Sequence, residues 1–104
     1  MDYKVIWTKA ALTDIEVIAN YIENDSLFYA SSVVSKVIDT TKTLSTFPFS
    51  GRILPEENSE IVRECFVYNY RVIYEIRKKR VYVLAVVHGK RLLPREIKER
   101  IGER

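Results

Sequence analysis

The chain of 104 residues contains one cysteine, one histidine, three glycines and three prolines. The single cysteine, Cys65, cannot form a disulfide within the chain, which fits the reducing cytoplasm. The scarcity of His and Cys argues against a protein-bound zinc site, and no nucleotide-binding motif is present, so we expect no cofactor. The longest apolar run falls far short of the roughly 20 residues of a membrane span, and the N-terminus has no signal-peptide pattern. We therefore expect a cytoplasmic protein.

The length of the chain is that of one ordinary domain, and its 47% hydrophobic and 12% aromatic residues are enough to form a core. The net charge of +3 is unevenly distributed: residues 1–50 carry four Lys and six Asp or Glu, whereas residues 51–104 carry 13 Lys or Arg and eight Glu. A basic second half favours an anionic partner such as a nucleic acid or an acidic protein. The simpler interpretation is a solubilising surface, and we expect the most basic run, Arg77–Arg80, to be a solvated turn.

Hydrophobic periodicity predicts the first half of the fold. A β-branched and aromatic run predicts a strand at residues 3–7. Apolar residues that recur at three- and four-residue steps then predict helices at about residues 9–24 and 27–46, and the short link between them favours an antiparallel pair. Thr8 is a suitable N-cap for the first helix.

The second half is predicted to be a loop followed by strands. Residues 47–60 contain two prolines and a glycine, as is typical of a loop. Strands follow at residues 60–67, 70–76 and 81–88, with links short enough for an antiparallel meander. The predicted fold class is α+β, in the order β-α-α-β-β-β. An antiparallel sheet is covered on one face by the helical hairpin, and the opposite face, or one end of it, stays open to solvent.

Basic residues are expected to gather at one end of the last hairpin. The turn of this hairpin is predicted near Lys78–Lys79, which places Arg71 opposite about Val86. His88 would lie just beyond, at the same end. The two bases that follow, Lys90 and Arg91, would turn back over this edge. The pattern therefore predicts that these side chains converge.

Such a cluster is typical of a ribonuclease. Arginine binds phosphate in a two-pronged way and can stabilise developing charge, and a neighbouring histidine can act as a general acid or base. Arg63 either joins the cluster or pairs with Glu75. The simpler interpretations are a surface salt bridge between Arg71 and Glu64 or Glu75, and an inert, hydrogen-bonded His88.

Three motifs in this order resemble the RelE/ParE superfamily. They are P-x-S-G-R at residues 48–52, Y-R-V-I-Y at 70–74 and V-x-H-G-K-R at 86–91. Members of the superfamily are toxins of type II toxin–antitoxin systems, often labelled plasmid stabilization proteins. The resemblance covers nearly the whole chain. It implies a single toxin domain at residues 1–93 and a short tail at 94–104 that is helical or mobile.

The resemblance implies two alternative targets. RelE-like members enter the ribosomal A site and cut mRNA without a metal, whereas ParE-like members bind DNA gyrase and block replication. Arg71 and Arg91 stand where RelE-like toxins carry active-site arginines, and His88 stands where some relatives carry a histidine. Ile97 stands where the family has a tyrosine, which weakens the catalytic interpretation.

Further contacts follow from the same resemblance. Arg52, Arg63 and Lys90 are the expected contacts to nucleic acid or to the target. The helical hairpin and the P-x-S-G-R motif look more like the ParE branch, which has no established catalytic residues to transfer. Our leading interpretation is a gyrase-directed toxin, and the alternatives are an mRNA endonuclease and a non-toxic binding module. Either branch implies a cognate antitoxin and a hetero-oligomer with it, docked on the helical hairpin or on an exposed sheet edge.

Overall fold

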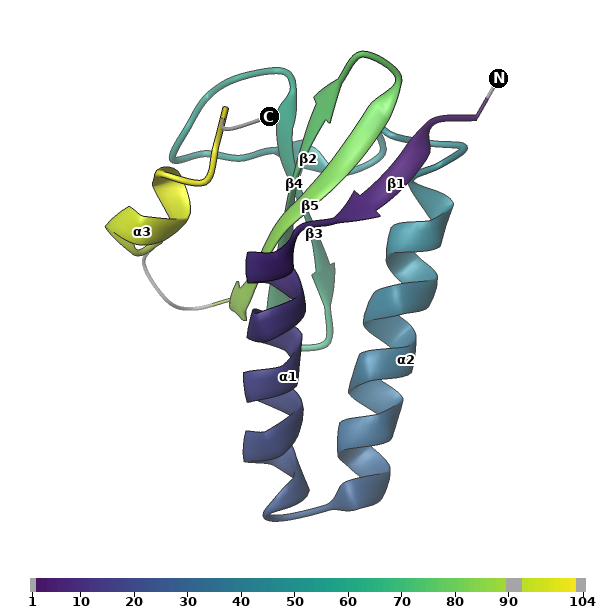
Figure 1. The fold of residues 1–104 in the computed structure, drawn as a ribbon, viewed down its shortest axis with the longest axis vertical. Helices are drawn as coiled ribbons and strands as arrows, with labels where there is room; N and C mark the ends of the chain where they lie inside the picture. The colour runs from purple at the N-terminus through teal and green to yellow at the C-terminus, as the bar shows by residue number, and fades with distance from the viewer. Residues whose placement is uncertain (1, 90–92, 103–104) are drawn as a thin grey trace.

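The computed structural model describes residues 2–89 and 93–102, and it has the predicted α+β architecture. A hairpin of two long helices lies against a five-stranded sheet (Figure 1). The elements in chain order are β1 (Lys4–Trp7), α1 (Lys9–Glu23), α2 (Leu27–Thr43), β2 (Arg52–Ile53), β3 (Val62–Val67), β4 (Tyr70–Arg77), β5 (Arg80–His88) and α3 (Arg95–Lys98). Among these described residues, no helix is long and apolar enough to cross a membrane.

Each long helix begins at a hydroxyl residue that caps it. The side chains of Thr8 and Ser26 accept hydrogen bonds from the backbone N–H three residues further on, at 3.2 and 3.0 Å. These bonds satisfy donors that the first turn of a helix leaves without a backbone partner. Both helices were expected, although α2 ends before the predicted residue 46. Leu44 and Ser45 donate to carbonyls three residues back, so the chain leaves α2 through a tighter turn.

The strand order in the sheet is β1-β5-β4-β3-β2. The strands β3, β4 and β5 form the antiparallel meander that their short links predict. However, β1 pairs with β5 in parallel, so the sheet is mixed and not wholly antiparallel as expected. The reason is topological, because the chain leaves β1 through both helices and returns beside it only with β5. The short strand β2 pairs with β3 inside the segment that was expected to be a loop.

A β-bulge in the β4–β5 hairpin changes the register that the sequence suggests. The hairpin turns at Lys78–Lys79 as predicted, but Leu84 is an extra residue on β5. Each pair beyond the bulge is therefore displaced by one position. As a result, Arg71 lies opposite Val87 and not opposite Val86.

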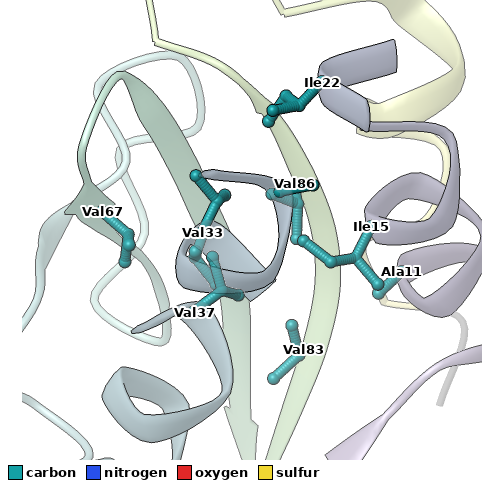
Figure 2. Packing of buried hydrophobic residues seen from close by; sticks show 10 residues of the cluster. Ala11, Ile15, Ile22, Val33, Val37, Val67, Val83 and Val86 are labelled. Atoms are coloured by element: carbon teal, nitrogen blue, oxygen red, sulfur yellow. The ribbon is translucent and has the colours of Figure 1, made fainter. Parts of the chain in front are cut away.

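The main core lies between the helical hairpin and the sheet (Figure 2). Alternate residues of the strands meet the apolar faces of both helices, as the two periodicities predict. The buried members of this cluster are Ala11, Ile15, Ile22, Ala30, Val33, Val37, Val67, Val72, Val83 and Val86. Burial of a valine or isoleucine contributes about 1.5–3 kcal/mol, which offsets the weak helix propensity of the valines in α2.

The opposite face of the sheet is also covered, which corrects the expectation that this face or one end of it stays open. Apolar residues of β4 and β5 pack there beneath the loop after β2 and beneath the segment that contains α3. Leu54, Leu93 and Ile97 are the buried anchors of these two segments. Neither segment has a periodic pattern long enough to predict packing. The division into a domain at 1–93 and a tail stays a prediction.

Candidate functional site

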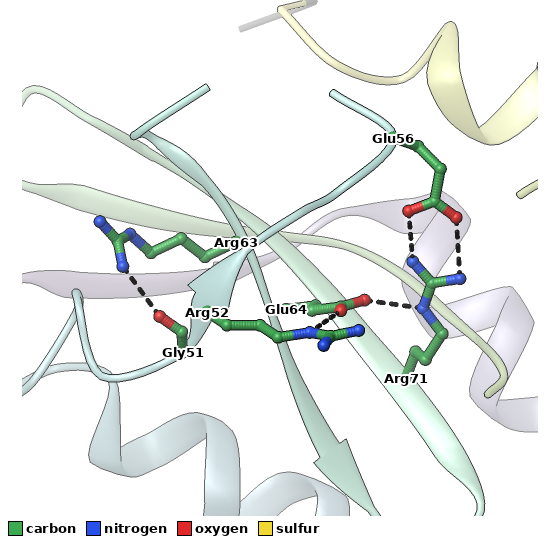
Figure 3. Close-up of polar contacts among 6 residues, drawn as sticks. All are labelled: Gly51, Arg52, Glu56, Arg63, Glu64 and Arg71. Carbon is green, nitrogen blue, oxygen red and sulfur yellow. Dashed lines mark hydrogen bonds and ion pairs between the residues drawn. The ribbon is translucent and has the colours of Figure 1, made fainter. Parts of the chain in front are cut away.

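Arg71, the central residue of the predicted basic cluster, is buried. Only 5% of it is exposed. Its Nε donates to Glu64 at 2.7 Å, and its two terminal nitrogens donate to the two carboxylate oxygens of Glu56 at 3.1 and 2.8 Å (Figure 3). The guanidinium thus meets Glu56 in the two-pronged geometry that arginine adopts with carboxylates and phosphates.

Glu64 joins two arginines. It is fully buried on β3, and Arg52 of β2 lies directly opposite it in the sheet. One carboxylate oxygen accepts from Arg71, and the other pairs with Nε of Arg52. The expected pair between Arg71 and Glu64 therefore forms, but inside the protein. We call Arg52, Glu56, Glu64 and Arg71 the ion-pair network, in which the arginines offset the cost of burying the Glu64 charge.

The contact between Arg71 and Glu56 shifts the pKa of both groups. The hydrogen bonds from Arg71 lower the pKa of Glu56 below its ordinary value of 4.5, although partial burial acts in the opposite direction. The bonds to Glu56 in turn raise the pKa of Arg71. Because the Glu56 carboxyl binds a proton less readily in the folded protein, its contribution to stability is present above the unfolded pKa. That contribution is lost as the pH falls through the lower, folded pKa.

Replacing Glu56 with glutamine is expected to reduce the loss of folding free energy that occurs as the pH falls below about 4.5, because the carboxyl with the lowered pKa is then absent. The measurement is the free energy of unfolding in urea at several pH values. Glu57→Gln, at an exposed neighbouring position, removes the same charge and is the matched control. A wild-type pH dependence in Glu56→Gln would show that this carboxyl titrates alike in the folded and unfolded states.

Arg63 does not join the ion-pair network. Successive side chains of a strand face opposite sides of the sheet, and Arg63 points away from Glu64 toward the loop before β2 (Figure 3). The Arg63 guanidinium donates at 2.8 to 3.2 Å to three backbone carbonyls, those of Phe49, Gly51 and Glu60. The expected alternative partner, Glu75, bonds to Arg77. Arg63 thus ties the loop to the sheet.

His88 lies on the other face of the sheet from Arg71. It pairs across the hairpin with Tyr70, with ring centroids 5.8 Å apart in an edge-to-face arrangement. Tyr70 packs against the main core, so its neighbour Arg71 points to the opposite face. The predicted convergence of Arg71 and His88 is therefore not found. Lys90 and Arg91 lie outside the described residues, and the catalytic roles of Arg71, His88 and Arg91 stay predictions.

His88 borders a cleft of about 410 Å³ between α1, the end of β5 and the segment around α3. Asp14 in this cleft accepts from the backbone N–H of Val86 at 3.1 Å and pairs with Arg100 at 2.7 Å. Arg100 also donates to the carbonyl of the extra residue in the bulge at 2.9 Å. No local pattern predicts this pair, because 86 residues separate its members. The backbone groups that they bind are those of Val86 and Leu84, at the bulge.

The remaining polar groups near the ion-pair network differ in exposure. The Arg52 side chain is 62% exposed, and its guanidinium carbon lies 5.3 Å from the centre of the Phe66 ring, a cation–π contact. Its role as a contact to nucleic acid or to the target stays a prediction. Burial raises the pKa of the Cys65 thiol to about 11, so it is protonated at neutral pH and a poor nucleophile.

The described residues hold no group of three or more His, Cys, Asp and Glu side chains that could bind a metal ion.

Comparison with solved structures places the fold in a known class. The chain is similar to a structure from a chromosomal ParDE toxin–antitoxin system of P. aeruginosa, with a TM-score of 0.70, 18% identity, and coverage of 85% of this chain and 97% of that chain. It is also similar to the solution structure of a conserved hypothetical protein from Helicobacter pylori, with a TM-score of 0.57, 18% identity, and coverage of 88% and 99%. Both likenesses concern the fold. The chain matches no curated protein at a significant level.

The family follows from the sequence itself. A family model described as the ParE toxin of the type II toxin–antitoxin system parDE matches residues 5–93. The chain therefore belongs to the ParE toxin family, within the RelE/ParE superfamily that its motifs resemble. Membership in this family implies a cognate antitoxin as a partner.

Proposed function

We propose that this toxin stops growth by inhibiting DNA gyrase in the cytoplasm and that its antitoxin releases the inhibition. The observation that carries the choice of target is the state of Arg71. Two carboxylates hold this arginine, and 5% of it is exposed. To bind an RNA phosphate, the Arg71 guanidinium would have to release Glu56 and leave the protein interior. The endonuclease alternative depends on this residue, so the ion-pair network supports the gyrase-directed alternative.

An exposed apolar surface supports the antitoxin as a partner. Near the turn between α1 and α2, Tyr21 is 73% exposed and Phe28 is 82% exposed. Further exposed apolar side chains in these helices and after β3 belong to Val17, Leu27, Tyr29 and Tyr68. Large exposed apolar side chains on neighbouring elements are typical of an interface. An amphipathic antitoxin segment laid along the helical hairpin would cover it.

The test compares the two targets with one preparation of purified protein. We expect inhibition of plasmid supercoiling by gyrase, and intact mRNA in a reconstituted translation system in which the 5′ ends of the mRNA are mapped. Cuts that depend on ribosomes, together with unaffected gyrase, would replace the proposal with the endonuclease alternative. Inducible expression without an antitoxin is the cellular control. Unrestricted growth of cells that contain folded protein would favour the non-toxic binding module.

A further inference from the structure

The turn between β4 and β5 has an unusual composition for its backbone. Lys78 and Lys79 occupy its two central positions, with φ values of 48° and 66°. Two-residue hairpin turns with both central residues in this left-handed region strongly prefer Asn-Gly. In this region a Cβ atom lies too close to the following carbonyl oxygen, which glycine avoids and asparagine offsets by local hydrogen bonds. Lys78 and Lys79 therefore occupy positions at which Asn and Gly would form the same turn with less backbone strain. Backbone strain of this kind is often retained at functional positions.

The strands around the turn add like charges at neighbouring positions. Arg80 lies opposite Arg77 in β4 and also opposite Lys4 in β1, and like charges placed directly across a sheet are destabilising. Glu75 balances part of the Arg77 charge. Lys79 adds a further cation, with its ammonium 5.0 Å from the centre of the Tyr3 ring. Lys4, Arg80 and Arg77 thus form a row of cations across three strands, and their mutual repulsion destabilises the sheet.

The end of the sheet that carries these cations has a surface hollow and lies far from the α1–α2 turn. A hollow of about 410 Å³ is lined by Arg77, Lys78, Arg80 and Tyr82. Figure 1 shows the β4–β5 turn and the α1–α2 turn at opposite ends of the long axis. The exposed apolar surface of the helical hairpin is therefore remote from the basic end, and an antitoxin segment bound there would leave the basic end accessible. We define the basic end as Lys4, Arg77, Lys78, Lys79 and Arg80.

We propose that the basic end binds the phosphate backbone of duplex DNA, with the β4–β5 turn directed into the major groove. Five cations gathered at one place, with Glu75 balancing part of one of these charges, are the electrostatic footprint of a polyanion partner. The major groove of B-form DNA admits a two-stranded β-ribbon, whereas that of A-form RNA is too narrow and deep for side chains to read. The binding is measured without gyrase, so its outcome is independent of the function proposed above.

The decisive variant is Lys78→Asn combined with Lys79→Gly. It removes two charges and installs the residues that the turn geometry prefers, so the melting temperature should stay the same or rise. With a fluorescein-labelled 20-base-pair DNA duplex of arbitrary sequence, anisotropy should show binding weakened by about tenfold or more at low salt. The plot of log affinity against log salt concentration should become less steep by about 1.8, or about 0.9 for each lost charge.

The control and a second probe make the result specific. Lys9→Gln combined with Lys36→Gln removes the same charge at exposed positions on α1 and α2, and it should bind DNA almost as the wild type does. Equal weakening in both double variants, or unchanged binding in the turn variant, would overturn the proposal. Binding of an RNA duplex of equal length that is as tight as that of DNA would overturn the assignment to DNA.

Discussion

Arg71→Ala is expected to lower the free energy of unfolding by about 3–5 kcal/mol, the range for breaking a buried ion pair from one side. The change removes the partner of Glu56 and one of the two cations that bond to Glu64. Glu64 is fully buried, so its charge cannot be hydrated in place of the lost bond. Arg52 would remain as its partner from a largely exposed position. The measurement is urea unfolding of the wild type and of the variant.

Two further variants separate structure from catalysis at Arg71. Adding Glu64→Gln to Arg71→Ala removes the buried carboxylate that has lost its partner Arg71, and it should recover part of the lost stability, because a neutral amide requires no cation. Arg95→Ala on α3, an exposed position, is the control and should change stability by about 0.5 kcal/mol or less. If Arg71→Ala lost toxicity with its stability intact, the result would contradict the structural role and support the endonuclease alternative.

Gly51→Ala is expected to destabilise the protein by about 1–3 kcal/mol or more, as overpacking of a well-filled interior does. A Cβ atom at this position would lie 2.5 Å from the Tyr74 hydroxyl oxygen and 2.6 Å from the backbone carbonyl oxygen of Glu64. The Tyr74 hydroxyl donates to the carbonyl of Pro48 at 2.8 Å and accepts from the N–H of Gly51 at 3.0 Å. The glycine of the P-x-S-G-R motif thus permits the loop to lie directly on the sheet.

A double-mutant cycle with Tyr74→Phe tests this explanation. Removing the hydroxyl breaks both hydrogen bonds and should cost about 1–3 kcal/mol by itself. It also removes one of the two close contacts, so Gly51→Ala combined with Tyr74→Phe should cost less than the sum of the single changes. Thr46→Ala, at an exposed position earlier in the same loop, is the control and should have little effect. If the losses of folding free energy were additive, the alanine Cβ would not be in close contact with the Tyr74 hydroxyl.

The order of elements was predictable because it depends on local patterns. Three- and four-residue spacing placed both long helices, the Thr8 cap marked the start of α1, and short links indicated the antiparallel meander. The parallel pairing of β1 with β5 was missed because no local signal distinguishes parallel from antiparallel pairing between strands so far apart. The extra residue Leu84 was missed for a similar reason, since a bulge of this kind leaves no motif in an apolar run.

The candidate site was predictable only in part. Glu64 was anticipated as one of two alternative partners of Arg71 in a surface salt bridge, with Glu75 as the other. Glu56 was not, because it comes from an irregular loop whose path depends on the burial of Leu54. The grouping of Arg71 with His88 also failed, since the bulge and strand alternation place them on opposite faces.

The sequence by itself determined the class of protein, the succession of helices and strands, and the excess of cations in the second half of the chain. These properties depend on composition and on the spacing of neighbouring residues. Only the tertiary structure decided that Arg71 is buried between two carboxylates, that the second face of the sheet is covered, and that a row of cations crosses three strands. Each of these depends on register and on contacts between distant segments. Side-chain burial and charge pairing are set by what the completed fold brings together.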